Sequence, residues 1–312
     1  MIILYIILIL IGCVVLVKSA DLVIKNLTRI ATTFHWSEFV VSFIIVAIAT
    51  SLPEIFIGLV SAINQVSTLS LGNVIGANII NLTLILGLVA IIGHGLSLKT
   101  KAIEMNVIFA IILSLLPMLF ALDGTLSRLD GLIILVCFVL YLILMFKMKE
   151  EFTKKISDHN KRELSQSIFY LVLGLIFLVL SAQLITSLAK ILAANFNLSP
   201  IFIGLLIVSL GTTLPELTFG IRGAIKKHKE MSLGSSLGTI VANSCLALGL
   251  AALIRPIQII NLNNFLIMLS FLILASFIFM TFIFSKKQLS LKEGVALVVF
   301  YIIFVIFQIL TR

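Results

Sequence analysis

The chain has 312 residues, of which 61% are hydrophobic and 11% charged, and its net charge is +9. A soluble globular domain carries about 25% charged residues. This composition therefore excludes a soluble fold and indicates a membrane protein.

Long apolar runs follow one another along the chain, and each can cross ~30 Å of hydrocarbon as a helix. We therefore expect an all-α polytopic membrane protein with ten transmembrane helices, over residues 2–31, 36–64, 68–93, 104–121, 127–146, 165–194, 199–225, 231–254, 261–284 and 291–311. Residues 147–166 have mixed charges and no apolar periodicity, so they are typical of a solvated linker.

The second half of the chain repeats the first at a constant offset of 162 residues. The matching pairs include Pro53 and Pro215, Glu54 and Glu216, Asn81 and Asn243, and Gly72 and Gly234. Such residue types in one register are not expected by chance, so they indicate an internal duplication. Each copy holds an odd number of spans, five. The copies, 1–146 and 165–312, are therefore predicted to be inverted around a 147–164 linker.

The distribution of Lys and Arg predicts the orientation, because cytoplasmic connections carry an excess of both. If the 147–164 linker is cytoplasmic, the outer side keeps only Arg128, Lys190, Arg255 and Arg312 outside the first span. Both termini are then extracellular in a multi-pass protein of the cell membrane. The positive charge is a topology signal, and no nucleic-acid partner is expected.

Glu54 and Glu216 each stand in an otherwise apolar segment, within ATSLPEIF and GTTLPELT. A charge at the bilayer centre costs roughly 2.5 to 3.5 kcal/mol on insertion scales. The spans around these glutamates supply no Lys or Arg at matching depth. We therefore expect a mobile cation as their partner, in the way that secondary transporters bind ions between inverted repeats.

Neutral oxygens accompany both acids. Spacings of three and four residues put hydroxyls on the same helical face as each glutamate, and an asparagine follows each glutamate in the next span: Thr50, Ser51 and Asn81 in the first half, Thr212, Thr213 and Asn243 in the second. Oxygens without thiol or imidazole suit a hard ion, and Ca2+ takes 6 to 8 of them. Pro53 and Pro215 are also expected to free backbone carbonyls around residues 47–51 and 209–213.

The paired motifs resemble the two alpha-repeats of the cation/Ca2+ exchanger superfamily, closest to prokaryotic Na+/Ca2+ exchangers. They are ATSLPE with GNVIGANIIN at 72–81, and GTTLPE with GSSLGTIVAN at 234–243. The resemblance covers the whole chain. It implies that Glu54 and Glu216 ligate Ca2+ with backbone or side-chain oxygens of Thr50 and Thr212. It implies Na+ sites around the same glutamates at Ala47, Ser51, Ser209, Thr213 and Thr239. The second, third, seventh and eighth helices would form the ion-binding core, and the first and sixth would slide across it.

Departures from the family pattern bear on the coupling ion. Family members usually have Ser at the position of Ala77 and often Asp at Asn243, while Ser235 and Ile240 replace asparagines of the usual second motif. Two glutamates are neutralised by one Ca2+ or by two protons, which favours H+ as the coupling ion. The oxygens of Ser51, Thr213 and Thr239 favour Na+. A Ca2+/Na+ antiporter is the preferred interpretation and a Ca2+/H+ antiporter the alternative.

An intramembrane enzyme and a cation channel are the two alternatives from other classes of function. An intramembrane enzyme would need an HExxH zinc motif, a serine with a histidine, or paired catalytic aspartates, and the sequence has none of these motifs. A cation channel also selects ions with acids, but channels usually build such rings from several subunits. We therefore expect a transporter that is not an enzyme, needs no cofactor and acts as a monomer in the lipid bilayer.

Overall fold

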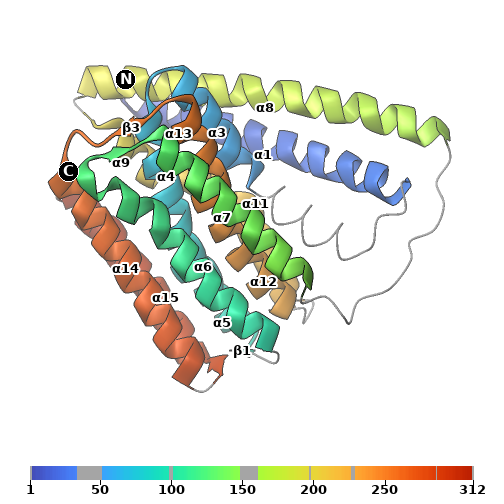
Figure 1. Cartoon of the computed structure of the whole chain (residues 1–312), viewed down its shortest axis with the longest axis vertical. Helices are drawn as coiled ribbons and strands as arrows, with labels where there is room; N and C mark the ends of the chain where they lie inside the picture. The colour runs from blue at the N-terminus through green and yellow to red at the C-terminus, as the bar shows by residue number, and fades with distance from the viewer. Residues whose placement is uncertain are drawn as a thin grey trace.

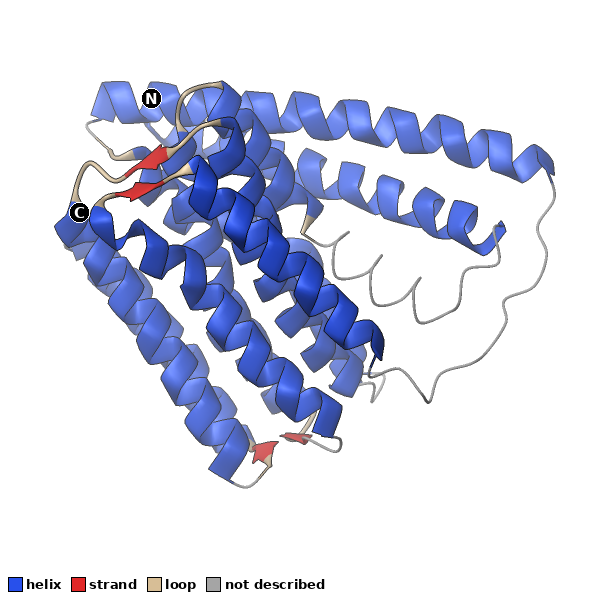
Figure 2. Ribbon diagram, in the orientation of Figure 1, coloured by secondary structure: helices blue, strands red, loops and turns tan. Residues whose placement is uncertain are grey.

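The computed structural model describes residues 2–33, 51–97, 101–147, 161–196, 198–225, 229–285 and 287–310. The fold is mostly helical (Figure 1; Figure 2). The first half contains α1 (Ile2–Thr33), α3 (Leu52–Ile63), α4 (Ser67–Ile80), η2 (Asn81–Ile85), α5 (Leu86–Ile92), β1 (Leu96–Ser97), α6 (Lys101–Phe120), η3 (Ala121–Asp123), β2 (Thr125–Leu126) and α7 (Arg128–Lys147). The second half contains α8 (Lys161–Phe196), α9 (Pro200–Ile203), η4 (Gly204–Val208), α10 (Ser209–Thr212), α11 (Leu214–Ile225), α12 (Lys229–Val241), η5 (Ala242–Ala247), α13 (Leu248–Ile254), β3 (Ile257–Gln258), α14 (Leu262–Ser285), β4 (Gln288–Leu289) and α15 (Leu291–Leu310).

Eight of the described helices are long and apolar enough to cross a membrane. The count becomes nine when Pro200–Thr212 and Leu214–Ile225, which meet at a 43° bend, are taken as one span. The expected span over 36–64 lies partly outside the described residues, and its described part is the short apolar helix α3.

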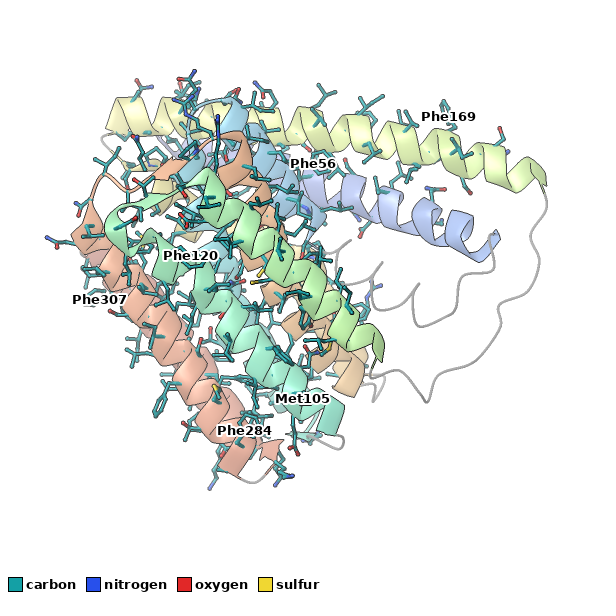
Figure 3. All side chains as sticks on the ribbon, in the orientation of Figure 1. Phe56, Met105, Phe120, Phe169, Phe284 and Phe307 are labelled. Carbon is teal, nitrogen blue, oxygen red and sulfur yellow. The ribbon has the colours of Figure 1, made fainter. Side chains whose placement is uncertain are left out.

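Two continuous helical rods form the centre of the bundle. One runs through α4, η2 and α5, and the other through α12, η5 and α13. In each rod, 78% of the apolar 18-residue stretch that could span the membrane is buried inside the protein. The outer helices bury far less. Phe169 on α8 and Phe307 on α15 are among the apolar side chains that remain exposed on the outside (Figure 3). Such exposure is the pattern expected where helices contact lipid.

Helices α1 and α8 pack against each other and cross the direction of α6, α7, α14 and α15 (Figure 1). Helix α8 has 36 residues and is therefore roughly 54 Å long, more than the ~30 Å that a straight crossing needs. It begins at Lys161, inside the segment expected as a linker, because Lys, Arg, Glu and Leu are all good helix formers. Residues 148–160 of that segment lie outside the described part of the chain.

Two short β ladders, which the sequence does not predict, accompany the helices. Strand β1 pairs antiparallel with β4, and β2 with β3, each over two residues. These ladders join connections between helices, and two residues are too few to leave an alternating pattern in the sequence. Each ladder joins a strand of the first half to one of the second.

The helix bounds follow the sequence repeat. Adding 162 to the bounds of α3 and α5 gives those of α11 and α13. The π-helical turns η2 and η5 also correspond to within one residue at each end. From the helix that carries the glutamate onward, the two halves thus form the same succession of elements, apart from η3.

Helix α4 contacts the α9–η4 segment backbone to backbone. A β-carbon on Gly72 would collide with the carbonyl oxygen of Ile201, and one on Gly204 with the carbonyl oxygen of Leu69. Gly72 thus permits a close approach of two helices, as glycine commonly does in membrane proteins. This contact brings the amide side chain of Asn73, on α4, beside the broken span of the second half.

Candidate ion-binding site

Each glutamate lies in the first turn of a helix, and the helix that carries Glu216 starts at the 43° bend of the second half. Pro53 occupies the first turn of α3 beside Glu54, and Pro215 and Glu216 have the same places in α11. Proline is tolerated there because the first amides of a helix have no partner within it. The exposed amides give this end a partial positive charge that stabilises a carboxylate.

The first turns of α3 and α11 have matching backbone bonds. The amide of Ile55 donates to the carbonyl of Ser51 over 2.9 Å, and the amide of Leu217 donates to the carbonyl of Thr213 over 3.0 Å. The sequence repeat therefore specifies the same local geometry twice.

Both carboxylates are buried and lie near each other. Glu54 is 0% exposed and Glu216 is 2% exposed, and the two are close enough to interact electrostatically. Among the side chains whose burial the structure describes, no Lys or Arg is buried; Arg222, on the same helix as Glu216, is exposed. A structural ion pair thus does not account for the two acids within the described residues.

The oxygens of these carboxylates have no hydrogen-bond partner among the described residues that meets normal geometry. Burying a charge without a partner is costly. Four unpartnered carboxylate oxygens in one buried place are, however, the donor set that a hard cation requires.

Thr212 connects the glutamates to α4. Its side chain lies beside the Glu54 carboxylate, and its Oγ1 donates a hydrogen bond to Oδ1 of Asn73 over 3.2 Å. The interaction brings together α10 and α4, from opposite halves of the chain. Thr212 and Asn73 are both 0% exposed.

Ser209 and Thr213 form a local network at the same break. The Ser209 hydroxyl donates to the carbonyl of Leu205 over 2.5 Å, and the Thr213 hydroxyl donates to the carbonyl of Ser209 over 2.8 Å. The Thr213 amide also donates to this carbonyl, over 3.1 Å. The expectation that the carbonyl of Ser209 is freed is wrong, because Thr213 supplies two donors to it.

Asn81 and Asn243 lie in wide π-helical turns, η2 and η5. The Asn81 amide donates to the carbonyl of Ala77 over 2.9 Å, which leaves its Oδ1 without a partner among the described residues. Both polar atoms of Asn243 are buried and likewise unpartnered there. Such turns are rare and are often found at functional sites.

The remaining expected residues divide into two groups. Ala47 and Thr50 lie outside the described residues. Ser51 and Thr239 are fully buried and engaged in interactions within the protein. Ser51 precedes α3 directly, two residues before Pro53.

Two residues of this region were not singled out from the sequence. They are Asn73 and Asn78, both fully buried on α4. Asn78 donates to Oγ of Ser244 in η5 over 2.6 Å, so it also bonds across the two halves. Both lie in the GNVIGAN motif, but their counterparts at 235 and 240 are Ser and Ile. A search for matched residues therefore passes over them.

The family comparison agrees with this chemistry. A family described as sodium/calcium exchanger protein matches residues 4–147 and 166–310. The chain belongs to the sodium/calcium exchanger family. Members of this family are transporters, so the protein is a membrane antiporter of the cation/Ca2+ exchanger superfamily and not an enzyme.

Individual relatives match over most of their length. The chain is 29% identical to the inner membrane protein YrbG of Escherichia coli, over 81% of this chain and 80% of that protein. It is 26% identical to the sodium/calcium exchanger MaX1 of Methanosarcina acetivorans, over 95% of this chain and 96% of that protein.

Solved structures show the same fold. The sodium-calcium exchanger NCX_Mj, soaked with Na+ and Sr2+, is 29% identical to this chain with a TM-score of 0.66. The match covers 97% of this chain and 98% of NCX_Mj. The family expectation is therefore confirmed, and so is the expectation of a mostly helical polytopic membrane fold.

Proposed function

We propose that this protein exchanges Ca2+ for Na+ across the cell membrane by alternating access. The observation that carries the proposal is the pair Glu54 and Glu216, which are buried, close enough to interact electrostatically, and without a cationic partner among the described residues. A transported divalent cation would neutralise both charges, so it can take the place of a fixed cationic partner.

The proposed architecture of the protein is an internal duplication. Ten transmembrane helices form two inverted repeats of five, over residues 1–146 and 165–312, joined by a cytoplasmic linker over 147–164. The 162-residue offset between helix bounds supports the duplication. Ladders β1–β4 and β2–β3, each formed between the halves, support an arrangement related by an approximate two-fold axis. Both termini are then extracellular.

The ions are assigned to the residues around the paired glutamates, near the middle of the membrane. Ca2+ is assigned to Glu54 and Glu216 with oxygens of Thr50 and Thr212, and the amide oxygens of Asn81 and Asn243 are assigned to the same site. Na+ uses the same glutamates with oxygens of Ala47, Ser51, Ser209, Thr213 and Thr239. The unpartnered oxygens of Glu54, Glu216, Asn81 and Asn243 support this assignment.

Access alternates when α1 and α8 move across the other helices. Their apolar contact residues, such as Cys13 and Leu16 on α1 and Leu178 and Ile185 on α8, form one cluster with residues of α3, α4, α9 and η4. Cys13 contacts the position of Gly211 and lies within electrostatic reach of Glu54. Helix α1 therefore borders the proposed ion site directly. A single chain supplies both glutamates, which supports function as a monomer.

Exchange of Ca2+ for H+ is the second candidate. Two carboxylates without partners can carry two protons in place of one Ca2+, and Ala77 supplies only its backbone carbonyl, which accepts the Asn81 amide. The buried hydroxyls of Thr213 and Thr239 favour Na+.

Reconstitution into liposomes separates these possibilities. Vesicles loaded with Na+ and diluted into Na+-free medium with Ca2+ should accumulate Ca2+ at clamped pH. Uptake that ignores the Na+ gradient but follows an imposed pH gradient would replace Na+ with H+. Ca2+ flux that requires no counter-gradient would instead indicate a channel.

A further inference from the structure

Asn73 stands next to the proposed ion site without an assigned role. It is fully buried on α4, and its Oδ1 accepts the Thr212 hydroxyl over 3.2 Å. Its amide nitrogen has no partner among the described residues. A buried amide whose oxygen accepts one hydroxyl of the opposite half, and whose nitrogen has no partner among the described residues, needs a physical explanation.

The hydroxyl of Thr212 has a single proton and several neighbours that could accept it. These are Oδ1 of Asn73 at 3.2 Å, the carbonyl of Ser209 at 3.4 Å and the adjacent carboxylate of Glu54. A hydroxyl carries one donor and two lone pairs. If the proton goes to Glu54, the lone pairs turn away from that carboxylate. If it goes to Asn73, the lone pairs remain available to a cation held by Glu54.

The second half of the chain cannot reproduce this contact. The position equivalent to Asn73 is Ser235, which is half-buried and carries a hydroxyl in place of an amide. The register that pairs Asn73 with Thr212 therefore supplies no amide acceptor at the equivalent position of the second half.

We propose that Asn73 is a positioning residue, which accepts the Thr212 hydroxyl proton so that the Thr212 oxygen faces a Ca2+ ion bound at Glu54. This inference rests on the proposed function and deepens it, because it makes the Thr212 side chain a ligand. The ion-binding site is then asymmetric even though the sequence repeat that builds it is symmetric. Ca2+, which takes 6 to 8 oxygens, gains one from this arrangement.

A double-mutant cycle tests the inference. Asn73→Ala, Thr212→Val and the combination are purified and reconstituted, and KM for Ca2+ and kcat are measured with the gradient that drives uptake in the wild type. Loss of one such hydrogen-bonded ligand should raise KM by about three- to tenfold, with kcat nearly unchanged. The double variant should be no worse than either single variant, because both changes remove one interaction.

Tyr141→Phe is the matched control. It removes another buried hydrogen bond between helices, from the Tyr141 hydroxyl to Asn106 over 2.7 Å, at a place without a role in the proposed site. Its KM should equal that of the wild type. An unchanged KM in Asn73→Ala, or single effects that multiply in the double variant, would overturn the inference.

If Asn73→Ala does not fold, the variants Thr212→Val and Thr50→Val can be compared instead. Thr212→Val should then raise KM more than Thr50→Val does, by about threefold or more. Equal effects of the two valines would overturn the inference. A wild type without Ca2+ uptake under either gradient would refute the proposed function itself, whereas normal wild-type exchange with unresponsive Asn73 and Thr212 variants would refute only this inference.

Discussion

The backbone of Gly72 lies directly against the carbonyl oxygen of Ile201, and no β-carbon fits between them. This contact joins α4 to α9 and thereby fixes Asn73 beside Thr212. The contact at Gly72 is therefore made by backbone atoms. A side chain introduced there would clash with the backbone of Ile201, and no change of rotamer could remove the clash.

Gly72→Ala should prevent stable folding. Overpacking in a well-packed core costs typically about 1 to 3 kcal/mol, and this clash with backbone lies at the upper end or beyond. Gly220→Ala is the control, because its β-carbon would meet only methyl groups of Ile85 and Val89, at 3.1 and 3.2 Å. Monodisperse elution after detergent extraction measures the outcome. Wild-type behaviour of Gly72→Ala would contradict the packing.

Asn64 and Gln183 connect the helix that carries Glu54 to α8. The Asn64 amide donates to Oε1 of Gln183 over 2.8 Å in an exposed position. If α8 moves across α3, this bond must break in each cycle. Its loss in Gln183→Ala should therefore increase hydrogen exchange in the turn after α3 and change kcat by up to about tenfold.

The control for this prediction is Gln258→Ala, at the exposed position of strand β3, which should leave both quantities unchanged. If Gln183→Ala also leaves hydrogen exchange and kcat at wild-type values, the bond does not restrain movement of α8.

Much of the site could be predicted from the sequence because the relevant signals are local. Proline next to a glutamate in an apolar run specifies a helix break with an acid in the first turn, and α3 and α11 have this form. The repeat then doubles the signal. The family resemblance adds the pairing of the two acids, which local pattern alone does not supply.

Other features could not be predicted because they depend on packing between distant segments. The bonds from Asn73 to Thr212 and from Asn78 to Ser244 span 139 and 166 residues. The π-helical turns at Asn81 and Asn243 differ from ordinary helix by one residue per turn, which leaves no mark in the apolar periodicity. The short β ladders arise where connections of opposite halves meet.

The two asparagines of the π-helical turns should matter less than the glutamates. Asn243→Ala removes a neutral oxygen and not a charge, so KM for Ca2+ should rise by about tenfold or less while exchange persists. Asn81→Ala should behave similarly, since its Oδ1 is also unpartnered among the described residues. Ca2+ uptake at varied Ca2+ concentration measures both.

Asn78→Ala offers a contrast on the same helix. It leaves the buried Ser244 hydroxyl without the amide that donates to it, so it should lower stability by about 1 to 3 kcal/mol. The Oδ1 of Asn78 also has no partner among the described residues, but its amide nitrogen is bonded to the opposite half, so we expect the KM of Asn78→Ala for Ca2+ to stay at the wild-type value. A rise in KM for Asn78→Ala equal to that for Asn243→Ala would contradict the distinction between ligand and structural asparagine.

The central claim is that Glu54 and Glu216 together bind the transported Ca2+, and Na+-driven Ca2+ uptake by the single variants Glu54→Gln and Glu216→Gln tests it most directly. Each change keeps the shape of the side chain but leaves one negative charge to face a divalent ion. Glu104→Gln is the control, because Glu104 pairs with Lys287 over 2.7 Å away from the proposed site. The account predicts no uptake by either site variant, although both insert into the membrane, and uptake near wild type by the control. Substantial exchange by Glu54→Gln or Glu216→Gln would contradict it.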